Sequence, residues 1–400
     1  MSYDVCIVGA GLVGLGVGRA LSETHPGIGL VIVDKEPKVA AHQSSHNSGV
    51  AHSGLYYRPG SLKASLCVGG RRALKEFCVA EGIKFDESGK LVIASRASEV
   101  AALDELERRG IANGLIGLTR LDADGLRDIE PAAVGVAALH VPEAGVVDFP
   151  AVAARVAEIL TSRGAEILTG YPVESITIND RSARIRSGDM EIRSRVVVNC
   201  AGLQSDRVAA LAGVRSDVRI VPFRGEYYTL APEAAHLVRA LIYPVPDPRF
   251  PFLGVHFTRG IDGKVEVGPN AVLAMGREHY RGASPNWGDL RETLGMPGFR
   301  RLVRRHWRVG ASEMVRSRSR SMYARSARIM VPGVRPEHLI AGGAGVRAQA
   351  VDSDGRLLDD FVIEESGSSI HVLNAPSPGA TSSFAIGAHI ATIAARHLAG

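Results

Sequence analysis

The sequence predicts an α/β fold of two domains, one of them Rossmann-like. Its 400 residues exceed what one simple core needs and correspond to roughly two domains of 100–200 residues each. A short apolar strand opens the chain and runs directly into a Gly-x-Gly-x-x-Gly turn. A further apolar strand that ends in a glycine turn lies far along the chain, at residues 196–202. Because no flexible linker separates these segments, the two domains are expected to be interleaved in the sequence.

The opening segment has each part of a dinucleotide-binding unit. Residues 4–8 are an apolar run with β-branched side chains, which is typical of a buried parallel strand. Three glycines then permit a tight turn, a close approach of backbone N–H groups to a pyrophosphate, and close packing of the next helix; they are Gly9, Gly11 and Gly14. Residues 30–33 form a second buried strand, and the carboxylate of Asp34 after it can bind the hydroxyls of an adenosine ribose. This arrangement predicts dinucleotide binding, and an acid at position 34 favours FAD or NAD over NADP.

Composition and charge exclude several classes of protein. Lys and Arg number 47 against 42 for Asp and Glu, and the net charge of +5 indicates anionic partners but no nucleic acid. The four cysteines are scattered without metal-ligand spacing, so neither a metal site nor a disulfide framework is expected. The uncharged run at residues 5–18 is too short to span a membrane, and the sequence before it does not resemble a signal peptide. We therefore expect a cytoplasmic protein.

Residues 42–63 follow the second strand and have an unusual composition. They are rich in small and polar residues and contain three histidines, a pattern that fits neither an amphipathic helix nor a strand. Small residues would let the backbone lie flat against a planar ring, with histidines close by. The segment therefore favours a flavin cofactor, and FAD over NAD.

From this segment onward the chain resembles a known family. It is similar to the FAD-dependent oxidases and dehydrogenases of the D-amino-acid oxidase and glycerol-3-phosphate dehydrogenase type. Residues 46–64, HNSGVAHSGLYYRPGSLKA, more closely resemble the signature of L-2-hydroxyglutarate oxidases and dehydrogenases. Further matching blocks lie at residues 222–228, 242–259, 267–274, 344–350 and 374–382, so the resemblance covers nearly the whole chain. One departure is Asp34, where Glu is more usual, and either carboxylate can bind the ribose.

The resemblance implies a domain division and a cofactor site. Residues 1–88, 147–218 and 336–400 would form a Rossmann-like FAD-binding domain of the glutathione-reductase and D-amino-acid oxidase type. Residues 89–146 and 219–335 would form an interleaved α+β substrate domain, built on an antiparallel sheet over the isoalloxazine ring. Besides the glycine motif and Asp34, the residues expected to contact FAD are Lys35, His46, Asn47, Ser48, Gly49, Val50, Val173, Ala201, Gly202, Gly345, Gly379, Ala380 and Thr381. His46 lies where some related flavoproteins attach the flavin covalently, so a covalent bond is a further hypothesis.

The substrate implied by the resemblance is a small dicarboxylate. The family oxidises L-2-hydroxyglutarate to 2-oxoglutarate: a base takes the hydroxyl proton while a hydride passes from C2 to flavin N5. A neutral histidine suits the base, and His52 is the first candidate, with His256 second. Arginine suits the carboxylates, since its planar fork binds them bidentately. The candidates for substrate binding are Arg347, then Arg224 and Arg259, with Tyr56, Tyr57 and Tyr243 as hydroxyl donors. For each of them, an ion pair, a loop hydrogen bond or simple packing is the structural alternative.

The electron acceptor is expected to be a quinone or oxygen. Residues 300–328 carry many arginines, and four of them fall on one face of a predicted helix: Arg301, Arg304, Arg305 and Arg308. A basic amphipathic helix can lie on an anionic lipid surface. Such peripheral contact, on the cytoplasmic face of a membrane, would suit reduction of a membrane quinone. A solvated basic face without this function is an equally good interpretation.

Three other functions stay open. A related flavoenzyme that oxidises glycerol 3-phosphate, malate or an amino acid would share the nucleotide motif and differ in the residues that bind the substrate's anionic group. A non-enzymatic flavin- or nucleotide-binding protein would have the same fold, and no hydroxy acid would bleach its flavin. An NAD-dependent dehydrogenase would contain no flavin, and the histidine-rich loop disfavours it.

Overall fold

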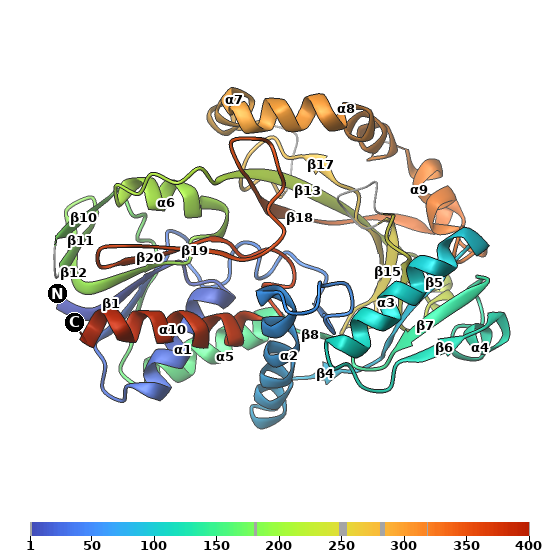
Figure 1. The fold of residues 1–400 in the computed structure, drawn as a ribbon, viewed down its shortest axis with the longest axis horizontal. Helices are drawn as coiled ribbons and strands as arrows, with labels where there is room; N and C mark the ends of the chain where they lie inside the picture. Colours follow the sequence, from blue (N-terminus) through green and yellow to red (C-terminus); the bar gives the residue numbers. More distant parts are fainter. Residues whose placement is uncertain (1, 180–181, 248–253, 281–284, 318, 400) are drawn as a thin grey trace.

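Two large sheets dominate the described part of the chain, and Figure 1 shows them side by side. The computed structural model describes residues 2–179, 182–247, 254–280, 285–317 and 319–399. Residues 248–253, which belong to the sequence block at 242–259, lie outside the described residues.

The first sheet has a parallel centre, as the opening motif predicts. Its strands are β1 (Ser2–Val8), β2 (Leu30–Val33), β9 (Glu166–Leu168), β10 (Ser175–Asn179), β11 (Ser182–Ser187), β12 (Met190–Asn199), β19 (Val362–Ser366) and β20 (Ser369–Asn374). Their order is β10-β11-β12-β1-β2-β9, with β20 pairing β12 and β19. The pairs β12–β1, β1–β2, β2–β9 and β12–β20 are parallel, and the others are antiparallel. The strand predicted from residue 196 is the second half of β12, which lies beside β1.

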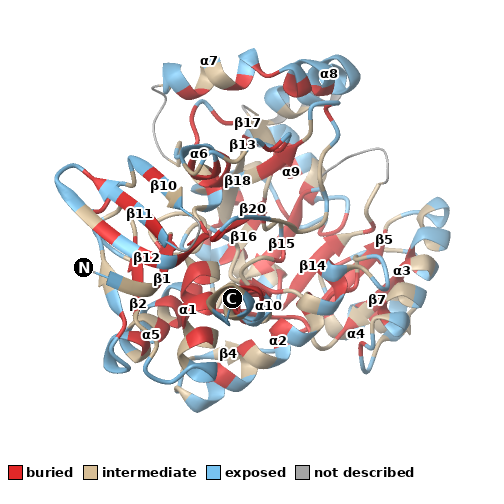
Figure 2. Cartoon of the chain, turned by 60° about the vertical axis from the view of Figure 1, so that its left-hand side comes forward, coloured by how far each residue is buried: buried red, intermediate tan, exposed pale blue. Residues whose placement is uncertain are grey.

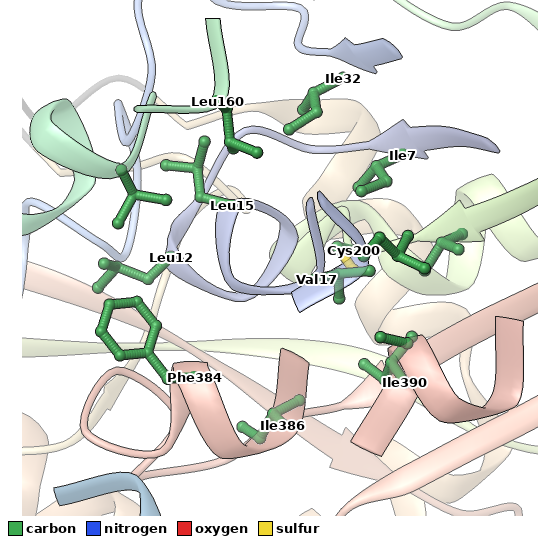
Figure 3. Packing of buried hydrophobic residues seen from close by; sticks show 14 of the residues in the cluster. Ile7, Leu12, Leu15, Val17, Ile32, Leu160, Cys200, Phe384, Ile386 and Ile390 are labelled. Carbon is green, nitrogen blue, oxygen red and sulfur yellow. The ribbon is translucent and has the colours of Figure 1, made fainter. Parts of the chain in front are cut away.

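Helices cover one apolar face of this sheet. They are α1 (Leu12–Thr24), α5 (Phe149–Ser162) and α10 (Ser383–Ala399). Figure 3 shows that Leu12 and Val17 of α1 lie on the face of the helix that is turned toward Phe384 and Ile390 of α10. The sheet and the three helices thus share one hydrophobic core.

Helices α1 and α10 touch through glycines. A Cβ atom on Gly16 would lie 2.5 Å from the carbonyl oxygen of Ser383, and a Cβ on Gly387 would lie 2.3 Å from the Gly16 carbonyl carbon. Only glycine allows two backbones to approach so closely. The backbones of α1 and α10 are therefore in direct contact, with no side chain between them.

The second sheet is antiparallel except for one pair. Its strands are β5 (Lys90–Ala94), β6 (Thr119–Leu121), β7 (Ala137–Val141), β13 (Arg219–Leu230), β14 (Leu241–Pro244), β15 (His256–Arg259), β16 (Val265–Gly268), β17 (Val272–Leu273) and β18 (Leu339–Val351). Their order is β17-β13-β16-β15-β14-β5-β7-β6, with β18 against β13 and a parallel β14–β5 pair. The boundary predicted at residue 336 must be corrected for β18, because this strand pairs with β13 along nearly all of its length. The other boundaries stay predictions.

Side chains alternate between the two faces of the second sheet. One face is apolar, with Leu91, Ile93, Phe257 and Val267 in one core cluster. The strand registers place on the opposite face a group of polar and aromatic side chains: Lys90, Tyr243, His256, Thr258 and Glu266. This polar face packs against the small sheet of β3 (Val50–Ala51), β4 (Phe85–Asp86) and β8 (Gly145–Val147), through Tyr243. The polar face is therefore turned toward the loop at residues 42–63.

The remaining helices lie around the two sheets. They are α2 (Leu62–Ala80), α3 (Val100–Ala112), α4 (Ala123–Ile129), α6 (Ser205–Leu211), α7 (Trp287–Gly295), α8 (Pro297–Ser317) and α9 (Arg320–Ala327), with 3-10 turns η1 (Ala97–Glu99), η2 (Gly202–Gln204), η3 (Pro232–Leu237) and η4 (Pro336–His338). The Ser61 hydroxyl caps α2 by accepting a hydrogen bond from Ala64 N. Helix α8 lies at the outer edge of the molecule, and Figure 2 shows most of it exposed. Among the described residues, no helix combines the length and the apolar character that crossing a bilayer requires.

Candidate active site

A cavity of about 930 Å³ lies between the two sheets. Most of the predicted cofactor residues line it: Gly9, Gly11, Asp34, Lys35, His46, Asn47, Ser48, Val50, Val173, Ala201, Gly202, Gly345, Gly379, Ala380 and Thr381. Gly14 and Gly49 are not part of the lining. A Cβ on Gly14 would lie 2.0 Å from Gly9 O, so this glycine packs α1 against the turn, as predicted. Gly49 has φ +68°, a conformation that favours glycine.

One end of the cavity fits the adenosine and pyrophosphate of a dinucleotide. Asp34 Oδ2 accepts a hydrogen bond from Ala10 N at 2.8 Å, and Oδ1 accepts one from Glu36 N at 2.9 Å. These bonds orient the carboxylate on the cavity wall. A Cβ on Gly9 would lie 2.5 Å from Cys200 O, so the glycine turn is held directly against the end of β12. The N–H groups of the first turn of α1 have no carbonyl partner within the helix, which suits a phosphate.

Lys35 also lies at this end of the cavity, where its ammonium group is bound to side chains of the protein. Its ammonium group pairs with Glu36 and, at 3.0 Å, with Glu278, and it lies 3.1 Å from His42 Nε2. Glu36, His42 and Glu278 converge closely enough to resemble a metal site. Because the Lys35 ammonium group contacts each of them, it already offsets part of the negative charge of this cluster.

The loop after the second strand forms the long wall of the cavity. Asn47 Oδ1 accepts a hydrogen bond from Gly49 N, and its Nδ2 donates to Ser44 O, so the side chain holds the turn. His46 packs on Tyr280, with ring centroids 4.1 Å apart. A Cβ on Gly345 would lie 2.7 Å from His46 O, so β18 supports this loop directly.

His52 lies at the other end of the cavity, near the C-terminal segment. Its backbone N donates to Thr381 Oγ1 at 3.1 Å, and its Nε2 lies 3.5 Å from Ser377 Oγ. Nδ1 is buried and makes no hydrogen bond to any residue that the structure describes. Burial, and then the positive charge of Lys90, lower the pKa of His52 to about 3, so the ring is neutral at physiological pH. A neutral ring is the form that can accept a proton.

His256 lies behind His52 rather than in the cavity lining. It stacks on Tyr243 with ring centroids 4.0 Å apart, and its Nδ1 lies 2.9 Å from Gly254 O. Burial lowers the pKa of His256 to about 4. The structure therefore brings both predicted histidines into one region but gives only His52 access to the cavity.

Two of the three predicted arginines line the cavity. Arg347 is exposed within it, while the surrounding protein desolvates the guanidinium group and lowers its pKa. Arg224 also lines the cavity, with Nε 3.6 Å from Glu226 Oε1. Arg259 does not, and its expected role must be corrected. Its guanidinium group donates to the carbonyl oxygens of Ala235 and Val238, because strand alternation turns it to the opposite face of the sheet from His256.

The three predicted tyrosines lie next to the cavity but outside its lining. Tyr56 and Tyr243 flank the ammonium group of Lys90, at 4.4 and 5.1 Å from their ring centroids. Tyr57 lies under the ammonium group of Lys63, at 4.9 Å. Tyr57 also hydrogen-bonds Ser377 of the cavity lining, and the predicted role of the three tyrosines as hydroxyl donors stays a prediction.

The chain matches a family model described as FAD dependent oxidoreductase over residues 4–393. It is 47% identical to an L-2-hydroxyglutarate dehydrogenase of Indibacter alkaliphilus, with 97% of each chain covered. It is also 43% identical to the L-2-hydroxyglutarate dehydrogenase of Escherichia coli strain K12, with 97% of this chain and 92% of the relative covered.

The chain belongs to the FAD dependent oxidoreductase family. The predicted resemblance, fold class and FAD cofactor are thereby confirmed. Among solved structures, L-α-glycerophosphate oxidase from Mycoplasma pneumoniae with FAD bound has a TM-score of 0.79 at 22% identity, and covers 100% of this chain and 95% of its own. Glycine oxidase from Geobacillus kaustophilus has a TM-score of 0.73 at 19% identity, and covers 99% and 95%. These two structures establish the fold.

The structure also places at the site three residues that the sequence did not predict: Ser44, Ser377 and Lys90. Ser44 Oγ accepts from Leu12 N at 3.0 Å and holds the first turn of α1, and Ser377 faces His52. Lys90 lies among the aromatic rings behind His52. The signal for Lys90 was a lysine at the start of an otherwise apolar strand, KLVIA, where no charged side chain is expected.

Proposed function

We propose that this chain uses FAD to oxidise L-2-hydroxyglutarate to 2-oxoglutarate. The observation that carries the proposal is the continuity of the cavity. One end has the glycine turn and Asp34, and the other has a neutral His52 together with the guanidinium group of Arg347. The names of the relatives at 43–47% identity supply the substrate and its handedness.

The residues at the cationic end each have a distinct task in this proposal. Arg347 binds a substrate carboxylate with its planar fork, which orients C2 and its hydroxyl group. The neutral ring of His52 takes the hydroxyl proton at Nε2, the nitrogen near Ser377. Arg224 lies opposite Val346 and so points to the other face of the β13–β18 pair from Arg347, and the second carboxylate is therefore not assigned to it. FAD, when bound, supplies the acceptor for the hydride that leaves C2.

An anaerobic titration of the yellow holoprotein tests this proposal. L-2-hydroxyglutarate is expected to bleach the flavin absorbance band near ~450 nm, since hydride transfer reduces the flavin. D-2-hydroxyglutarate is the matched control and should leave the band unchanged. Bleaching by glycerol 3-phosphate or malate, and not by L-2-hydroxyglutarate, would contradict the substrate.

We further propose that α8 is a peripheral membrane contact through which electrons reach a quinone. Arg304, Arg305 and Arg308 are exposed on this helix, next to exposed Trp307 and Val303. Arg301 was expected in the same group, but it pairs with Asp354 at 3.3 Å, in the turn that follows β18. The helix is kinked at His306 (φ −122°, ψ 16°), so Arg308 and Trp307 follow the kink and the predicted single helical face is interrupted there. Exposed basic and apolar side chains close together on such a segment suit an anionic lipid surface.

Vesicle binding tests the membrane contact. The triple variant R304Q/R305Q/R308Q is expected to bind anionic phosphatidylglycerol vesicles roughly 100-fold more weakly, at about 1 kcal/mol for each arginine. The variant R184Q/R186Q/R193Q removes the same charge from the exposed β11–β12 hairpin and serves as the control. Equal binding by both triple variants would leave α8 as a solvated basic face, with oxygen as the simpler acceptor.

A further inference from the structure

Residues 274–280 follow β17 and lie against the cofactor end of the cavity. Strand β17 pairs with β13 of the second sheet. Glu278 nevertheless lines the cavity together with Lys35 and His46, which follow β2 of the first sheet. The wall of the cofactor site therefore includes a segment that continues from the second sheet, and the sequence did not predict this contribution.

Arg277 fixes the first part of this segment. Only 1% of its surface is exposed, and its guanidinium group pairs with the Asp206 carboxylate on α6 and donates to Leu203 O at 2.7 Å. The backbone N of Arg277 donates to Asp289 Oδ2 at 2.8 Å. Charge-assisted hydrogen bonds in a buried position are strong and geometrically specific. They hold the segment beside η2 and α6, which follow the central strand β12 of the first sheet.

Glu278 connects two residues of the cavity lining. Its Oε2 accepts a hydrogen bond from Lys35 Nζ at 3.0 Å, and its Oε1 accepts one from Gln204 Nε2 at 2.6 Å. Lys35 follows Asp34, the predicted ribose ligand, whereas Gln204 lies on η2. The side chains of Glu278 and Lys35 are 32% and 33% exposed, so water and salt weaken this ion pair. Glu278 thus links two separate segments at the cofactor end through contacts that can open while the Arg277 anchor stays buried.

Tyr280 packs on the loop that forms the long wall of the cavity. Its ring lies 4.1 Å from the His46 ring and 5.8 Å from the His42 ring, measured between centroids. His46 Nδ1 lies 3.0 Å from His42 O, so the His46 ring is held on two sides. The Tyr280 hydroxyl group is buried and has no hydrogen-bond partner among the described residues. Ring packing therefore accounts for this contact.

We propose that Glu278 and Tyr280 retain FAD in its site. Glu278 holds Lys35 and Gln204 together across the cofactor end, and Tyr280 is a positioning residue that keeps His46 in the cavity wall. A cofactor enclosed by contacts between separate parts of the chain leaves only when these contacts open, so they slow its dissociation. This inference concerns the cofactor alone. It holds or fails whatever the substrate and whatever the role of His52.

The test measures the release of FAD from the purified holoprotein. Release is followed by the rise in flavin fluorescence, in a fixed urea concentration below the unfolding transition, because uncharged urea leaves ion pairs unscreened. The double variant E278A/Y280A is expected to release FAD about tenfold faster, since it loses one exposed ion pair and one aromatic pair. Tyr280→Phe keeps the ring and should release FAD at the original rate.

Glu337→Ala is the matched control for the lost carboxylate. Glu337 pairs with Arg335 at 3.2 Å on the surface, and neither residue lines the cavity. This variant should release FAD at the original rate. Equal release from E278A/Y280A and Glu337→Ala would overturn the inference. If the double variant does not fold, Glu278→Gln and Tyr280→Leu replace it, each with a smaller expected increase.

Two further outcomes would also count against the proposal. Faster release from Tyr280→Phe would assign the effect to the hydroxyl group and contradict the role of the ring. Flavin that stays with the acid-precipitated chain would show a covalent bond, and this bond would then retain the cofactor in place of Glu278 and Tyr280.

Discussion

The two faces of the second sheet differ although the same strands build them. On one face, Leu91, Phe257 and Val267 pack in a continuous apolar core. On the other face, Lys90, Tyr243 and His256 form a buried polar layer behind the cavity. Neighbouring residues of one strand thus have opposite tasks, because strand geometry sends alternate side chains to opposite faces. The apolar face stabilises the sheet. The polar face lowers stability and lies next to the residues proposed to act on the substrate. Substitutions on each face test this division.

The largest effect is expected from His52→Asn, at the cavity end of the polar layer. Loss of the proton acceptor should lower the rate of flavin reduction by L-2-hydroxyglutarate by roughly 10²- to 10⁴-fold. The thermal midpoint should change little, because the ring makes few hydrogen bonds. Stopped-flow absorbance measures the rate, and His25→Asn, at an exposed position, is the control. A rate within a factor of three of the original would rule out His52 as the base.

Arg347→Lys should have the next largest effect. Lysine keeps the charge but lacks the planar fork, so kcat/KM should fall by about 10²-fold. Arg259→Lys is the matched control, since Arg259 bonds to backbone carbonyls on the far face. Steady-state kinetics on both variants decides the point. Equal losses in the two variants would mean that the faces are not functionally distinct.

Phe257→Ala tests the apolar face. The ring is fully buried, so its removal should lower the free energy of unfolding by about 3–5 kcal/mol. The acid limb of flavin reduction in the folded holoprotein should stay at its original pH. Thermal unfolding and a pH profile measure the two quantities, and a shifted limb would show that the faces are coupled.

Lys90→Met is expected to change the free energy of unfolding by less than Phe257→Ala does, and with the opposite sign. The folded-state pKa of about 8 lies below the ordinary value of 10.5, so the folded protein binds this proton less readily than the unfolded chain. The lysine therefore costs stability below pH 8, and this cost decreases between pH 8 and 10.5. Its removal should stabilise the protein by about 2–3 kcal/mol at pH 7 and by little at pH 10.5. Unfolding at both pH values checks the sign.

The sequence predicted the cofactor end of the site better than the substrate end. The glycine turn and Asp34 were recognisable because their spacing along the chain mirrors their positions in space. Arg259 was misassigned because a strand residue's face depends on register, which sequence spacing alone did not provide. Lys90 was overlooked for the same reason: its neighbours Tyr56 and Tyr243 come from a loop and from another strand. The placement of β18 also required the pairing with β13.

The close contact of α1 with α10 has a consequence for folding of the protein. The glycine turn and the segment with Ser377 and Thr381 line the same cavity but lie far apart along the chain. The apolar face that α10 covers stays open until this contact between distant segments forms. Because non-local contacts form slowly, the cavity is expected to be completed late in folding, after the local elements around it.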